Sequence, residues 1–146
     1  MNPARLSIDE ALQLHRRFLQ EVLAEVLPVL SRGDASAERL VAGLHAYWEA
    51  CLARRGMRCA VLDGVRDSPA ATVVEPMGKP FEVMVRAELL PELGTPATAL
   101  AAQIYEDARS IAVDEAATGE REGERRRALI ARIRTAAART SIPRAA

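Results

Sequence analysis

The sequence predicts an all-α fold, a helical bundle of about six helices in one domain that spans residues 1–146. Hydrophobic residues make up 49% of the chain, charged residues 27% and aromatic residues only 3%, and this Ala- and Leu-rich balance favours helices and a packed core. Apolar residues recur at spacings of three and four, and no segment alternates as a strand does. A domain of this size buries roughly two thirds of its unfolded surface, so no disulfide or metal is needed for folding.

Charge and cysteine content restrict the class of protein. The 20 basic and 20 acidic residues give a formal net charge of zero, so there is no general attraction to nucleic acid or to an anionic membrane. Cys51 and Cys59 lack metal-type spacing, and no secretory segment is apparent, which predicts a cytoplasmic protein without metal or cofactor. The longest apolar run falls far short of the roughly 20 residues of a membrane span.

The first two helices have recognisable ends. Ser7 and Glu10 have the spacing of a capping box, so the first helix is expected to begin near residue 8. Pro28 is expected to kink or end its last turn. Residues 31–36 have loop composition, and Gly56 is expected to stop the second helix as a C′ glycine.

The middle of the chain is the hardest part to interpret. A short third helix is expected over 57–65, followed by a break at 67–69. Prolines and a glycine between 76 and 80 predict a kink or loop. A further helix over 81–90 is expected to end at Pro91 and Gly94, and a new helix to start with Thr95 as its cap and a proline in its first turn. An inward orientation of Arg86 would favour an anionic ligand.

Two long helices are predicted over 96–118 and 122–138. The first is rich in alanine on one face, which would allow another helix to approach closely. Asp107 and Asp114, seven residues apart, suggest paired catalytic carboxylates, the solvated side of an interface helix, or partners for the arginines of the last helix. Glu122 and Arg126 have the favourable i, i+4 order of a helical ion pair.

Three segments in this order resemble the C-terminal half of TetR-type transcriptional regulators: 44–52 (LHAYWEACL) with 56–58 (GMR), 85–89 (VRAEL), and the Ala-rich helix that ends in DEAATG at 114–119. In that family several helices surround a ligand pocket, and the last two pair with those of a second subunit. The resemblance therefore implies a homodimer. Its expected interface residues are Leu100, Ile104, Ala108, Ile111, Leu129, Ile130 and Ile133.

The family's helix-turn-helix head should precede the first helix, yet only six residues stand before Ser7. We therefore expect no DNA binding by this chain alone. One role consistent with this departure is heterodimerisation with a full-length regulator, whose operator binding a headless subunit would weaken.

The predicted pocket lies between the helices of residues 8–90 and takes a small apolar or aromatic effector. His15 and Trp48 could each bind that effector or belong to the core, and the methionines could form an adaptable wall or fill gaps. Whether the 76–80 kink opens space or is packed shut decides between a pocket and a solid core. The candidate ligand-binding residues are His15, Leu19, Trp48, Cys51, Met57, Met77, Phe81 and Met84.

Two other classes of function remain. One is a structural or protein-interaction module without a cavity, and the other is an enzyme that uses Asp107 and His15. The enzyme has the least support, because the sequence holds no nucleophile elbow, P-loop or dinucleotide fingerprint. We predict that the protein is not an enzyme.

Overall fold

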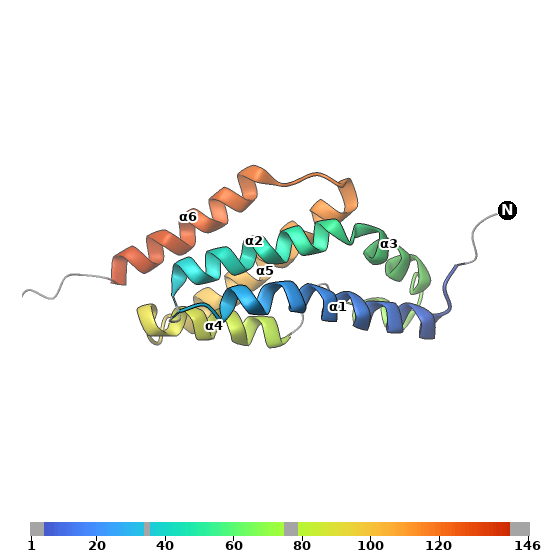
Figure 1. Cartoon of the computed structure of the whole chain (residues 1–146), viewed down its shortest axis with the longest axis horizontal. Coiled ribbons are helices and arrows are strands. Elements are labelled where there is room, and N and C mark those ends of the chain that lie inside the picture. The colour runs from blue at the N-terminus through green and yellow to red at the C-terminus, as the bar shows by residue number, and fades with distance from the viewer. Residues whose placement is uncertain (1–4, 34–35, 75–78, 141–146) are drawn as a thin grey trace, which may run out of the picture.

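The computed structural model describes residues 5–33, 36–74 and 79–140, and over these residues it is a bundle of six α-helices without strands (Figure 1). This confirms the predicted all-α class. The elements are α1 (Ile8–Leu30), α2 (Ala37–Ala53), α3 (Arg55–Gly64), the 3-10 turn η1 (Pro69–Thr72), α4 (Lys79–Leu93), α5 (Ala97–Thr118) and α6 (Gly123–Thr140).

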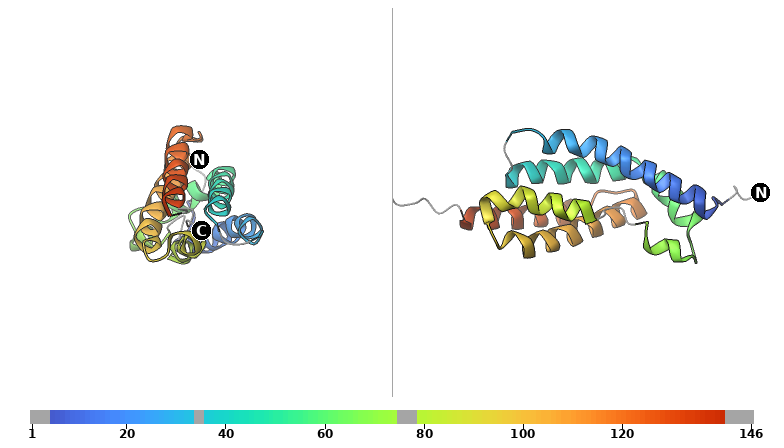
Figure 2. Two further views of the ribbon diagram at one scale, coloured as in Figure 1. Left: turned by 90° about the vertical axis from the view of Figure 1, so that its left-hand side faces the viewer. Right: turned by 90° about the horizontal axis from the view of Figure 1, so that it is seen from below.

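The helices form an elongated bundle in which α2 contacts each of the other five helices. Seen along the bundle, α1 and α2 lie on one side, α5 and α6 on the other, and α4 between them at the bottom (Figure 2). The main apolar core collects side chains from α1, α2, α4, α5 and α6. A smaller cluster of Ala11, Val61, Val65 and Val74 joins α1 to α3 and the segment that follows it.

Helix α1 begins as predicted. The Ser7 hydroxyl accepts from the Glu10 amide at 3.1 Å, and the Glu10 carboxylate accepts from the Ser7 amide at 3.2 Å. As expected, Pro28 lies in the last turn of α1, which ends two residues later at Leu30. Pro28 lies on the exposed side of this turn, so its ring avoids the core while the helix loses only one backbone hydrogen bond.

The prediction that Gly56 stops α2 is wrong. Helix α2 ends at Ala53, and Arg54 makes the turn with φ −109° and ψ 24°, its amide donating to the Cys51 carbonyl at 3.2 Å. Gly56 therefore lies in the first turn of α3. The predicted break after α3 is confirmed: Asp67 takes a φ of 62°, and Ser68 caps η1.

Helices α4 and α5 meet at a glycine turn. Pro91 lies inside α4, and Gly94, with a φ of 62°, ends that helix as predicted. The expected Thr95 cap is wrong, because Pro96 occupies the N-cap position and no side chain caps α5. The turn is instead closed by the backbone, with the Ala97 amide donating to the Gly94 carbonyl at 2.9 Å.

Candidate functional site

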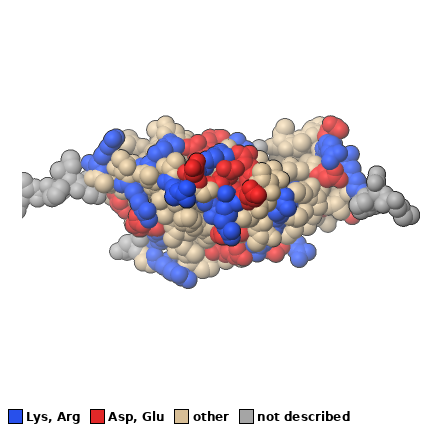
Figure 3. Space-filling model, turned by 90° about the horizontal axis from the view of Figure 1, so that it is seen from above, with Lys and Arg blue, Asp and Glu red and all other residues tan. Residues whose placement is uncertain are grey.

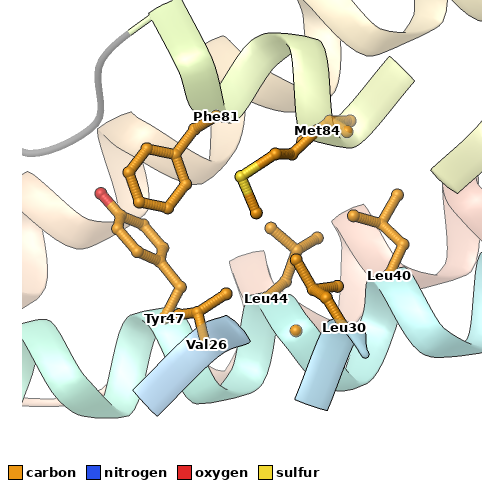
Figure 4. Close-up of a pocket in the computed structure, with 9 residues that line it drawn as sticks. Val26, Leu30, Leu40, Leu44, Tyr47, Phe81 and Met84 are labelled. Carbon is orange, nitrogen blue, oxygen red and sulfur yellow. The ribbon is translucent and has the colours of Figure 1, made fainter. Parts of the chain in front are cut away.

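An apolar gap lies where the end of α1, the first half of α2 and the start of α4 meet (Figure 4). No polar atom is exposed on its wall. Since water in such a gap finds no hydrogen-bond partner, the gap favours an apolar occupant or none. The residues that line it are Val26, Leu30, Leu40, Gly43, Leu44, Tyr47, Phe81, Met84 and Val85.

The gap is small in this conformation, with a volume of about 20 Å³. That volume corresponds to roughly one water molecule. Met84 is half-buried, and its thioether extends from α4 towards Leu44 and Leu30 (Figure 4). The size of the gap therefore depends on one flexible side chain, because methionine has three rotatable bonds and adapts its shape easily.

One end of the gap is formed by two aromatic rings. Tyr47 from α2 and Phe81 from α4 lie with their ring centroids 5.7 Å apart and their planes tilted by 48°. Tyr47 is only 1% exposed, and this burial raises the pKa of its hydroxyl. The phenol therefore stays neutral and presents a ring, not a charge, to the gap.

Polar contacts hold the second half of α4 in place. The Arg39 guanidinium from α2 donates to both carboxylate oxygens of Glu88, at 2.7 and 2.9 Å. Glu92 accepts from the Ala37 amide at 2.8 Å and so caps the start of α2 from a neighbouring helix. We call these contacts the α2–α4 clamp. It joins α4 to α2 one to two turns beyond Met84, whereas the first turn of α4 borders the apolar gap.

Only two of the predicted ligand-binding residues, Phe81 and Met84, line the gap. Met77 lies outside the described residues. His15 is buried elsewhere on α1 beside Phe18, with ring centroids 6.3 Å apart. The other four pack in or against the core without reaching the gap: Leu19, Trp48, Cys51 and Met57.

Sequence reasoning missed most of the gap's wall on α2. Gly43 was not singled out, although a Cβ at this position would stand 2.6 Å from Cδ2 of Leu30, so the glycine marks a close approach of α1 to α2. A glycine inside a helix, on the same face as Leu40, Leu44 and Tyr47, is the signal that would have pointed here.

Trp48 belongs to a buried polar network on the other side of α2. Its indole Nε1 donates to the Ala108 carbonyl at 3.1 Å, and the Arg126 guanidinium lies 5.2 Å from its ring centroid. Arg126 donates to both oxygens of Glu115, at 2.6 and 2.7 Å, and to Glu49 at 3.1 Å. The predicted ion pair of Arg126 with Glu122 is therefore replaced by partners on α5 and α2.

The acidic residues of α5 act as partners for arginines. Asp107 pairs with Arg132, and Asp114 pairs with Arg125. This agrees with the pairing alternative considered for these carboxylates and gives their spacing of seven a structural explanation. Among the described residues, no group of three or more His, Cys, Asp or Glu side chains is placed to hold a metal ion.

The residues expected at a dimer interface are buried or partly buried in the core of one molecule. Six of the seven are at most 7% exposed and pack against helices of the same molecule, and Leu100 is partly buried. Their inward orientation was predicted correctly, but in this conformation they offer little surface to a second chain. The six are Ile104, Ala108, Ile111, Leu129, Ile130 and Ile133.

The two cysteines differ sharply in environment. Cys51 is buried in the core, which raises the pKa of its thiol to about 12, whereas Cys59 is exposed on α3. Because the thiolate is the reactive form, an aromatic disulfide reagent at pH 8 is expected to label Cys59 rapidly and Cys51 only when the core opens. Mass spectrometry over time measures the labelling rate of each thiol, with Cys59→Ser as the control. Labelling of both thiols at one rate would show that the core around Cys51 is not closed.

Comparisons of the chain with family models, with curated proteins and with solved structures give no match. No family is therefore assigned, and the TetR-type resemblance remains a prediction from the sequence. Over the described part of the chain, no helix is long and apolar enough to cross a membrane.

Proposed function

We propose that the chain is a non-enzymatic regulatory domain that binds a small apolar or aromatic molecule between α1, α2 and α4, as the resemblance to TetR-type regulators implies. The observation that carries this proposal is the apolar gap, whose wall comes from three helices and exposes no polar atom. Arg86 is exposed, so it does not turn the gap into a site for an anion.

Binding requires the gap to widen. A space of about 20 Å³ is far smaller than a benzene ring needs, so a ligand must displace the Met84 side chain or move the first turns of α4. The α2–α4 clamp holds the second half of α4, so movement is expected at the half that borders the gap. A ligand that fits only the widened form shifts the population towards it.

Such a movement supplies a regulatory output. Leu30 at the end of α1 and Gly43 in α2 both line the gap, so an occupant that separates them changes the tilt between these helices. Packed helices respond by small rigid shifts because a close-packed core has little room for continuous deformation. The end of α1 is therefore the part of the molecule through which occupancy of the gap is transmitted.

The test is a titration with benzene, and then toluene, of protein labelled with ¹³C at its methionine methyl groups. The Met84 resonance, assigned with Met84→Leu, is expected to shift along a saturable curve while the Met57 resonance stays in place. Gly43→Ala places a methyl group in the wall of the gap, 2.6 Å from Cδ2 of Leu30, and is expected to weaken binding at least about fivefold, since this group occupies space that the ligand needs.

Gly56→Ala is the matched control, because a Cβ at Gly56 meets nothing within 4 Å and lies far from the gap on α3. Its benzene affinity is expected to equal that of the unmodified chain. If neither compound shifts Met84 up to its solubility limit, the gap does not open and the structural or protein-interaction module is the better explanation.

The homodimer remains part of the proposal. Since the apolar residues of α5 and α6 named above face the chain's own core, a second copy would have to contact their outer sides, where Val113 and Ala128 are exposed. Analytical ultracentrifugation of the purified chain measures the oligomeric state, and a monomer at all concentrations would remove the dimer from the proposal.

A further inference from the structure

A surface groove of about 590 Å³ runs between α2 and α6, on the other side of α2 from the apolar gap. Its volume lies in the range of roughly 300–1,000 Å³ typical of small-molecule sites, although the groove is open on one side. At 100° per residue, His45 projects from α2 roughly 140–160° away from Leu40, Gly43 and Tyr47, which line the gap. The groove is lined by His45, Arg127, Ile130, Ala131, Arg134 and Thr135.

Ion pairs that α2 makes with α6 and with the turn before α6 flank the groove. Towards the start of α2, Glu38 pairs with Arg134 at 2.8 Å. Towards its end, Glu49 pairs with Arg121 at 2.7 Å and with Arg126 at 3.1 Å. Figure 3, seen from above, shows basic and acidic side chains interleaved over this surface. Most of the arginines on this face are therefore already neutralised.

Arg127 is the exception within the groove. Its guanidinium makes no ion pair and no hydrogen bond with any residue in the described part of the chain. On α2, His45 lies between the two paired glutamates in the sequence and lines the groove. Its ring is exposed and lies edge-on to that of Trp48, with ring centroids 5.7 Å apart. The groove thus holds one cation without a carboxylate, beside a donor-bearing ring.

The floor of the groove adds an apolar contribution. Ile130 and Ala131 lie one helical turn after Arg127 on α6, so a bound molecule can contact both features at once. An arginine beside an apolar surface binds a carboxylate with two parallel hydrogen bonds, and the partial exclusion of water strengthens them.

We propose that this groove binds a small molecule that carries one carboxylate and an apolar or aromatic body. The carboxylate accepts from the Arg127 guanidinium, the body covers Ile130 and Ala131, and His45 lines the opposite wall. This goes beyond the proposed function, because the site, its helices and the charge of its ligand all differ from those of the apolar gap.

The test is a ¹H–¹⁵N NMR titration with 2-naphthoate, compared with its neutral methyl ester. Shifts are expected to cluster on His45 and on residues 127–135. The ester, and Arg127→Gln with 2-naphthoate, are each expected to bind at least about fivefold more weakly, since each loses the charge-assisted hydrogen bonds. Arg139→Gln is the matched control, because Arg139 is exposed on the same helix outside the groove.

The proposal is overturned by equal weakening in the two arginine variants, which would indicate only general charge attraction, or by ester binding as tight as that of the acid. Shifts confined to residues of the apolar gap, or no saturable shift at millimolar 2-naphthoate, would overturn it as well. Because benzene carries no charge and reports on Met84, failure of this proposal and failure of the proposed function are distinguishable.

Discussion

Replacement of Glu115 by alanine is expected to lower the free energy of unfolding by about 3–5 kcal/mol, because it leaves the buried Arg126 guanidinium without its main partner. Glu115 is 1% exposed and Arg126 is 6% exposed, and the two side chains form two hydrogen bonds of 2.6 and 2.7 Å. Glu115 also accepts from the Glu122 amide at 2.8 Å, which fixes the turn between α5 and α6.

Chemical denaturation followed by Trp48 fluorescence measures this loss. Glu106→Ala is the matched control, since Glu106 lies on the same helix, is exposed and pairs with Arg109 at i, i+3. Its effect is expected to stay below about 0.5 kcal/mol. A loss of less than about 1 kcal/mol in Glu115→Ala would show that water reaches Arg126 and that the network is not closed.

A double variant separates the pair's net contribution from the penalty of breaking it. Replacing Glu115 with leucine and Arg126 with methionine together removes both charges while it keeps similar side-chain volume. Such replacements of buried ion pairs are often neutral or stabilising. The double variant is therefore expected to be more stable than Glu115→Ala, and its remaining deficit reports the lost contacts to Glu49, Trp48 and the Glu122 amide.

Apolar periodicity predicted the helices and their buried faces, but not which surface covers those faces. Ile104, Ile111 and Ile133 follow a helical spacing that indicates burial, and all three are at most 2% exposed. A pattern of this kind does not distinguish a neighbouring helix of the same chain from a helix of a second chain. The dimer-interface assignment came from the family resemblance, and here the chain's own core buries these residues.

The polar network was harder to predict. Arg126 stands in a run of alternating charges, EREGERRR, and local spacing favours Glu122 as its partner. Its actual partners are Glu115 and Glu49, 11 and 77 positions away in the sequence. Such contacts depend on how α2, α5 and α6 pack against one another, which local periodicity does not encode.

The candidate ligand-binding residues were predicted from their residue types. The position of the gap depends instead on how α1, α2 and α4 cross one another. Met84 and Phe81 were predicted because methionine and aromatic side chains commonly line apolar sites. Trp48 and Cys51 have equally suitable side chains, but Trp48 donates to the Ala108 carbonyl of α5 and Cys51 packs in the core, so neither lines the gap. Gly43 lets α1 approach α2 closely, so a glycine at this position indicates where the two helices cross. The chemistry of the larger side chains gives no such indication.

Gly64→Ala and Gly56→Ala, two identical substitutions in α3, are expected to change stability in opposite directions. A Cβ at Gly64 would stand 2.7 Å from Cβ of Ala11 and 3.3 Å from the Leu6 carbonyl oxygen, so α3 must move away from α1. Such overpacking costs about 1–3 kcal/mol. A Cβ at Gly56 meets nothing within 4 Å, and the loss of unfolded-state freedom is expected to stabilise by about 0.4–1 kcal/mol.

Thermal unfolding of the two variants gives the sign of each effect, and a third substitution tests the cause. Ala11→Gly removes the methyl group that the new Cβ at residue 64 would meet, so Gly64→Ala combined with Ala11→Gly is expected to lose less than the sum of the two single variants. Additive losses would mean that the backbone near Leu6, and not Ala11, sets the distance between α1 and α3. Both glycines lie in α3 without positive φ, so backbone conformation does not distinguish them. The opposite stability changes expected at positions 64 and 56 therefore depend on the close approach of α3 to α1 at Gly64.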